Sequence, residues 1–66
     1  MNDQNGIEFN VHVEYANGAT VSSRIGDVDA KKNLPKSIGM AIKTHLDNFN
    51  VFNEKILRIQ IDMRDI

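Results

Sequence analysis

The sequence has no cysteine and no tryptophan, and it contains one proline and four glycines among 66 residues. Without cysteine, the chain forms no disulfide bond and offers no thiolate ligand to a metal ion. Apolar runs do not exceed three residues, so no segment has the pattern of a membrane-spanning helix. The polar start MNDQNG is unlike a signal peptide. We therefore expect a cytoplasmic protein without a membrane segment.

The chain also lacks an excess of charge of either sign. Eight Lys and Arg residues oppose nine Asp and Glu residues, which gives a net charge of −1 and an isoelectric point near 6.0. This balance differs from the strongly basic surface of a typical nucleic-acid-binding domain. We expect residues 1–66 to form a single domain of modest stability, because so short a chain leaves much of its surface in water. A homodimer would bury more of it.

The segment IEFNVHVEY, residues 7–15, alternates without a break between apolar and polar side chains. This pattern predicts a strand with one buried and one solvated face. The preceding residues 1–6 are polar, and we expect them to be disordered.

Asn17 and Gly18 mark a turn after this strand. A two-residue loop there would place Arg24 in the core and Val21 in water. A three-residue loop pairs Val13 with Val21 instead, and a shift of one residue moves every side chain to the other face. We therefore predict a type I turn with a G1 bulge, in which Gly18 adopts the left-handed conformation.

Residues 19–25 form a weaker second strand, and turn-forming residues fill the loop 26–33. Pro35 suits the first turn of a helix. A helical stripe then follows, consisting of Leu34, Ile38, Ala41, Ile42, His45, Leu46 and Phe49. Gly39 lies at the edge of this stripe, which suggests a close approach to the sheet.

Residues 55–63 alternate again, with four side chains expected to face inward: Leu57, Ile59, Ile61 and Met63. A right-handed crossover and a central first strand give the strand order 2-1-3. The predicted fold class is therefore α+β: a small two-layer ββαβ domain with a three-stranded antiparallel sheet and one helix packed on one face.

Neither histidine predicts a catalytic or metal site. His45 lies within the apolar stripe, where no other ligand follows one turn away, so we expect a packed residue at the core edge. His12 lies on the outer face beside Ser22 and near Glu14, an arrangement similar to a Ser-His-Glu trio. A flat sheet offers that trio no pocket and no oxyanion hole. We expect no enzyme, no cofactor and no metal ion.

Lys31, Lys32 and Lys36 cluster near the start of the helix, where the helix dipole favours anions. A phosphate or an acidic partner would fit there, although no glycine-rich phosphate loop accompanies the lysines. The outer sheet face carries no aromatic side chain on which bases could stack, so nucleic-acid binding is not favoured.

Several apolar residues fall outside the expected core. Met40 projects from the polar face of the helix, whereas Val51, Phe52 and Ile56 either close the end of the core or form a patch with Ile66. The third strand lies at a sheet edge that only outward charges guard, so it could pair with itself in a homodimer or with a partner strand. The candidate partner-binding residues are Met40, Phe52, Arg58, Arg64, Lys31, Lys32 and Lys36.

These patterns lead to three functional expectations. The first is a non-enzymatic protein-interaction or regulatory module that binds a partner protein. By analogy of size and architecture alone, such a module is a phage-type or mobile-element-type inhibitor. The alternatives are a weak nucleic-acid-binding or phosphate-binding protein that uses the three lysines, and a structural homodimer.

Overall fold

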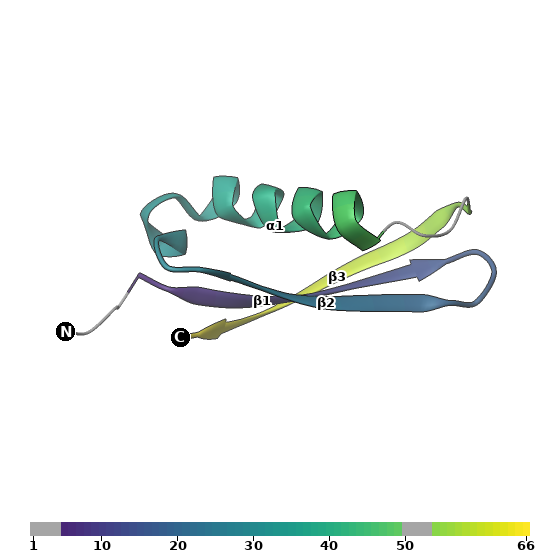
Figure 1. The fold of residues 1–66 in the computed structure, drawn as a ribbon, viewed down its shortest axis with the longest axis horizontal. Helices are drawn as coiled ribbons and strands as arrows, with labels where there is room; N and C mark the ends of the chain where they lie inside the picture. Colours follow the sequence, from purple (N-terminus) through teal and green to yellow (C-terminus); the bar gives the residue numbers. More distant parts are fainter. Residues whose placement is uncertain (1–4, 50–53) are drawn as a thin grey trace.

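The computed structural model describes residues 5–49 and 54–66, which form a sheet with one helix along one side (Figure 1). The strands lie in the order β2-β1-β3, and both neighbouring pairs are antiparallel. The predicted α+β fold and its strand order are therefore confirmed. The elements are β1 (Ile7–Tyr15), β2 (Thr20–Asp27), the 3₁₀ helix η1 (Ala30–Asn33), α1 (Leu34–Phe49) and β3 (Ile56–Asp65).

The central strand β1 supplies most of the core. Phe9, Val11, Val13 and Tyr15 are all fully buried, while the residues between them are half-exposed. Each such side chain stabilises the fold by about 1.5–3 kcal/mol when it leaves water. Because β1 pairs on both edges, its alternation determines which side of each neighbouring strand faces α1.

The turn between β1 and β2 has the predicted three-residue form. Gly18 has a φ of 89°, and Val13 lies opposite Val21 in the ladder. The N–H of Ala19 donates to Asn17 Oδ1 at 2.9 Å, which holds the turn. Strand β2 extends beyond the predicted residue 25 and ends at Asp27.

A hydrogen-bonded carboxylate connects the end of β2 to α1. Asp27 accepts a hydrogen bond from Ser37 Oγ at 2.6 Å and another from the backbone N–H of Asp29 at 3.0 Å. These two bonds, with that from Ser37 the stronger, lower the pKa of the Asp27 carboxyl group. The segment 26–33, predicted as a loop, contains the short helix η1. Helix α1 then begins at Leu34, with Pro35 in its first turn.

Helix α1 packs mainly against β1 and β2. Its buried residues are Ser37, Ala41 and His45, which lie along one stripe of the helix. A Cβ atom placed on Gly39 would meet nothing within 4 Å. The predicted close approach of Gly39 to the sheet is therefore wrong, because the helix turns this residue towards solvent.

A β-bulge alters the start of β3. The register of the β1–β3 ladder shifts between Glu14 and Tyr15, so that Tyr15 lies opposite Ile56. Ile56 is half-buried against the core, whereas Leu57 is 57% exposed. The prediction that Leu57 faces inward is therefore wrong. A bulge inserts one extra residue and breaks the strict alternation on which that prediction rests.

The predicted disorder of residues 1–6 falls mostly outside the described residues, which begin at Asn5. The carbonyl of Asn5 accepts a hydrogen bond from the N–H of Lys31 at 3.0 Å. The carbonyl of Gly6 accepts one from the N–H of Ile66 at 3.2 Å. Backbone hydrogen bonds thus tie Asn5 and Gly6 to η1 and to the residue that follows β3.

Replacing Gly39 by alanine is expected to raise the free energy of unfolding by about 0.5–1 kcal/mol. Alanine favours the helical conformation over glycine, and its Cβ would enter open space. Urea unfolding followed by circular dichroism measures the change. A lower free energy of unfolding would contradict the placement of Gly39 on the solvent side.

Replacing Gly18 by alanine is expected to lower the free energy of unfolding by about 1–2 kcal/mol, because a positive φ brings Cβ close to the backbone. Gly26→Ala is the matched control in the same hairpin. Its Cβ would lie 3.9 Å from Ile66 Cδ1, an ordinary contact, and its φ is not in the left-handed region. Equal losses in the two variants would rule out the bulged turn as the cause.

Candidate functional site

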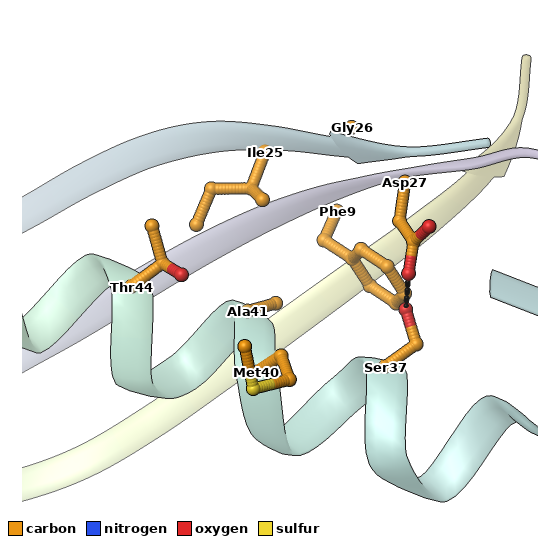
Figure 2. Close-up of a pocket in the computed structure, with 8 residues that line it drawn as sticks. All are labelled: Phe9, Ile25, Gly26, Asp27, Ser37, Met40, Ala41 and Thr44. Carbon is orange, nitrogen blue, oxygen red and sulfur yellow. Dashed lines mark hydrogen bonds between the residues drawn. The ribbon is translucent and has the colours of Figure 1, made fainter. Parts of the chain in front are cut away.

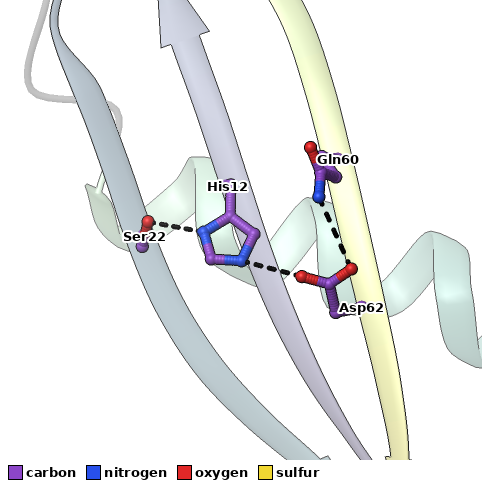
Figure 3. A network of polar contacts seen from close by, with 4 residues as sticks. All are labelled: His12, Ser22, Gln60 and Asp62. Atoms are coloured by element: carbon purple, nitrogen blue, oxygen red, sulfur yellow. Dashed lines mark hydrogen bonds and ion pairs between the residues drawn. The ribbon is translucent and has the colours of Figure 1, made fainter.

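Polar side chains from all three strands form a network on the outer face of the sheet (Figure 3). His12 lies in β1 opposite Ser22 of β2 and Gln60 of β3. Its Nδ1 is 2.7 Å from Ser22 Oγ, and its Nε2 is 3.3 Å from Asp62 Oδ2. Gln60 also approaches this carboxylate, at 3.5 Å. The network therefore joins the three strands through one imidazole ring.

In the network, a serine contacts a histidine, which in turn contacts a carboxylate. The carboxylate is that of Asp62 and not that of the predicted Glu14. Glu14 instead faces Arg58 at 3.8 Å. The adjoining depression, lined by Asn10, Ser22, Ser23 and Arg24, is open to solvent. Nucleophilic catalysis needs a site that excludes water and presents fixed donors to an oxyanion. The network instead serves as a cross-strand contact.

The other outer-face charges pair within the chain. Glu8 lies 2.8 Å from Arg64 and 3.7 Å from Arg24. Arg64 and Arg58, both candidate partner-binding residues, thus each face a carboxylate of β1. Exposed pairs of this kind contribute about 0–1 kcal/mol each to stability. They also leave the outer face with little excess charge to attract a polyanion.

The three candidate lysines lie in η1 and at the start of α1, as predicted. Lys31 forms an ion pair with Asp65 at 2.9 Å, and Lys32 forms one with Asp29 at 3.2 Å. Lys36 lines an open depression that also contains Asp27 and Asp29. Carboxylates therefore offset two of the three positive charges. Among the described residues, no group of three potential ligands could hold a metal ion.

His45 is fully buried in the core, beyond the edge position predicted for it. Its Nδ1 is hydrogen-bonded to Ser23 Oγ, and its ring lies 5.5 Å from that of Phe49. Its Nε2 is buried, with no hydrogen-bond partner in the described part of the chain. Burial, and to a smaller extent repulsion by the charge on His12, lower the pKa of His45. The ring is therefore neutral at pH 7.

A small pocket of about 160 Å³ lies between β2 and α1 (Figure 2). It falls below the range of roughly 300–1,000 Å³ that is typical of small-molecule sites. Met40, a candidate partner-binding residue, closes one side of it and is otherwise exposed. The lining consists of Phe9, Ile25, Gly26, Asp27, Ser37, Met40, Ala41 and Thr44.

A partly exposed apolar row runs along β3 on the side of the sheet that carries α1, and its middle residue, Ile61, packs against the core. We call it the β3 strip, and it consists of Ile59, Ile61 and Met63. Ile59 is 38% exposed and Met63 51% exposed, although they lie opposite the buried Val13 and Phe9. The strip is open because α1 packs mainly over β1 and β2. Alternation along β3 predicts its inner face to be buried, so the exposure of Ile59 and Met63 was not predicted from the sequence.

The helix presents a second apolar surface on the same side. Ser37 and Thr44 turn towards β2, where both line the small pocket. At 100° per residue, the opposite flank of α1 carries Ile42, Leu46 and Phe49. We call these three residues the α1 flank, and Phe49 is 42% exposed. Because β3 lies on the far side of β1 from β2, the α1 flank faces the side of the β3 strip.

The remaining apolar candidates separate into three groups. Ile56 packs against the core and does not form a surface patch with Ile66. Ile66 is exposed at the end of the chain. Val51 and Phe52 lie outside the described residues, and the predicted role of Phe52 stays a prediction.

Comparisons with protein families, curated proteins and solved structures found no match to this chain. Within the described residues, α1 is too short and too polar to cross a membrane.

The free energy of unfolding is expected to fall as the pH drops below about 6.5, the ordinary pKa of histidine. In that range the unfolded chain binds a proton at residue 45, whereas the folded chain, with its lowered pKa, does not. The slope cannot exceed about 1.4 kcal/mol per pH unit for one proton. Unfolding in urea at a series of pH values measures it.

His45→Gln is expected to flatten this slope, while its amide can still bond Ser23. His12→Gln is the matched control, because His12 lies on the outer face and its removal leaves the buried ring in place. If His45→Gln kept the full slope, the pH dependence would arise from another group.

Proposed function

We propose that this chain is a non-enzymatic protein-interaction module. It binds a partner protein on the open side of the sheet, with the β3 strip as the floor of the interface and the α1 flank as its wall. The observation that carries the proposal is the exposure of Ile59 and Met63 opposite fully buried residues of β1. An apolar row that continues a core into solvent is a surface that a partner can cover.

The grouping of apolar residues along β3 distinguishes this surface from ordinary exposed apolar residues. Single exposed apolar side chains are common on soluble proteins, whereas contiguous ones mark interaction sites. The β3 strip lies on β3, and the α1 flank lies on the side of α1 nearer to β3. Covering them would stabilise a complex by roughly 25 cal/mol for each Å² of apolar surface removed from water.

The charged residues support a protein partner over a nucleic-acid partner. Lys31, Lys32, Arg58 and Arg64 each lie near a carboxylate of the same chain. Binding to nucleic acid gains affinity when positive side chains neutralise phosphates and release counterions. Because these four side chains already lie near carboxylates, they favour nucleic-acid binding only weakly. A small inhibitor or regulator of the phage or mobile-element type would act by such surface complementarity, without catalysis.

Met63→Glu tests the proposal, with Val28→Glu as the matched control. Val28 is 58% exposed in the loop after β2, close to the 51% of Met63, but it lies outside the β3 strip. The wild-type chain is immobilised and proteins are captured from a lysate of its source. The affinity of each captured and purified protein for the variants is then measured.

We expect Met63→Glu to weaken binding at least about tenfold, or ~1.4 kcal/mol, because it places a charge in an apolar contact. Val28→Glu should stay near wild type. The proposal fails if both variants bind equally well. It also fails if the chain retains nucleic acid and loses it in Lys31→Glu.

A further inference from the structure

The residues of the β3 strip also direct their backbone groups to the free edge of β3. Alternate residues of an antiparallel strand form hydrogen bonds to opposite neighbours. The N–H of Tyr15 bonds to Ala19 on the β2 side, so the odd-numbered residues of β1 face β2. The even-numbered Gly6 accordingly bonds to Ile66 on the β3 side. From Arg58 onward, beyond the bulge, the even-numbered residues of β3 therefore bond to β1 and the odd-numbered ones direct their backbone groups outward.

Within residues 5–49 and 54–66, no strand pairs with this edge, so Ile59, Ile61 and Met63 offer both apolar side chains and backbone groups directed outward. An edge with these properties is suited to the addition of another strand. Strand β2, the other edge, lacks this combination. The odd-numbered residues of β2 bond to β1, so its outward backbone groups belong to even-numbered residues such as Ser22 and Arg24, whose side chains are polar.

We propose that the partner is a second copy of this chain, whose β3 pairs antiparallel with β3 across a two-fold axis at Gln60. The two three-stranded sheets then join into one continuous sheet with both helices on the same side. This inference rests on the proposed function, because it names the occupant of the same open side.

The alternation of β3 limits the possible registers. An axis between two residues would set polar side chains of one copy opposite apolar ones of the other, so the axis must pass through a residue. Centring on Ile61 places Arg58 opposite Arg64 of the second copy, and centring on Asp62 places two carboxylates opposite each other. Like charges directly opposite are destabilising. Both registers are therefore disfavoured.

Centring on Gln60 gives complementary charges. Arg58 of each copy then lies opposite Asp62 of the other, so the pair forms twice. Centring on Ile59 would instead set Arg58 opposite Gln60, so that neither Arg58 nor Asp62 has an opposite charge across from it. Centring on Met63 would also set opposite charges together, Asp62 with Arg64, but it sets Ile61 opposite Asp65 and leaves Ile59 beyond the end of the second copy's β3. Gln60 is therefore the centre that matches both the charges and the apolar residues.

The apolar residues fit the same register. Ile59 lies opposite Ile61 of the second copy, and the two residues exchange both backbone hydrogen bonds. The two β3 strips become adjacent and form one apolar floor between the helices. Cross-strand pairs of this type contribute about 0.2–1 kcal/mol each.

An engineered cysteine tests the register directly, because the chain has none of its own. Gln60 would face its own copy in a non-hydrogen-bonded pair, with Cα atoms about 4.5 Å apart, a distance that a disulfide spans. We expect Gln60→Cys to form a disulfide-linked dimer under mild oxidation. The matched control, Asp62→Cys, lies on the same face, but four residues of offset place it about 13 Å from its own copy. It should stay unlinked.

A charge exchange tests the cross-copy ion pair. Sedimentation equilibrium should show that Arg58→Glu and Asp62→Arg each weaken the dimer at least tenfold, and that the double variant restores it. The double variant does not restore the contacts of Arg58 with Glu14 or of Asp62 with His12 in the same chain. Rescue would therefore report the pair between copies.

Self-pairing is overturned if the wild type sediments as a monomer across micromolar concentrations and Gln60→Cys links no better than Asp62→Cys. In that case, loss of partner capture in Met63→Glu would still support the proposed function with a different occupant. Conversely, a linked Gln60→Cys dimer with no effect of Met63→Glu on capture would retain self-pairing and reject binding of another protein at the β3 strip.

Discussion

Pairing of β1 on both of its edges is the constraint on which the rest of the structure depends. Phe9, Val11, Val13 and Tyr15 are fully buried, and each neighbouring strand takes the register that matches this face. The bulged turn at Gly18 has the length that keeps Val21 on the buried side. Helix α1 then covers β1 and β2, and its position leaves the helix-side face of β3 in contact with solvent. The candidate interface is thus a consequence of how one strand is shared.

Features that depend on neighbouring residues were predictable from the sequence. The bounds of β1, the turn at Gly18, the helix after Pro35 and the strand order each follow from alternation, turn chemistry or handedness. The exposure of Ile59 and Met63 was not predictable in this way. Alternation shows which side a residue faces, but whether another element covers it depends on where α1 lies in three dimensions. The bulge at Leu57 and the pairing of His12 with Asp62 likewise arise between strands.

The two sides of the sheet have opposite chemical character. On the outer side, His12, Glu8 and Glu14 of β1 each contact oppositely charged or polar side chains of the flanking strands, so that polar groups are satisfied within the chain. On the helix side, the polar exceptions are the buried His45 with Ser23 and the pair of Ser37 with Asp27, while Ile59 and Met63 of the β3 strip and Phe49 of the α1 flank remain exposed. The apolar contacts of a partner on the helix side would depend little on ionic strength, whereas an ion pair across the β3 edge would weaken as salt is added.

The long separation of β1 and β3 along the chain has a consequence for synthesis. Strands β1 and β2 are adjacent, and α1 follows them directly, so these elements can associate as soon as they leave the ribosome. Strand β3 emerges last, and it pairs Ile7 with Asp65 across nearly the whole chain. Until then, the second edge of β1 is an open template. On a polysome, where nascent copies are close together, that edge can accept the β3 of a neighbouring chain, so the order of translation exposes the same sheet to strand exchange.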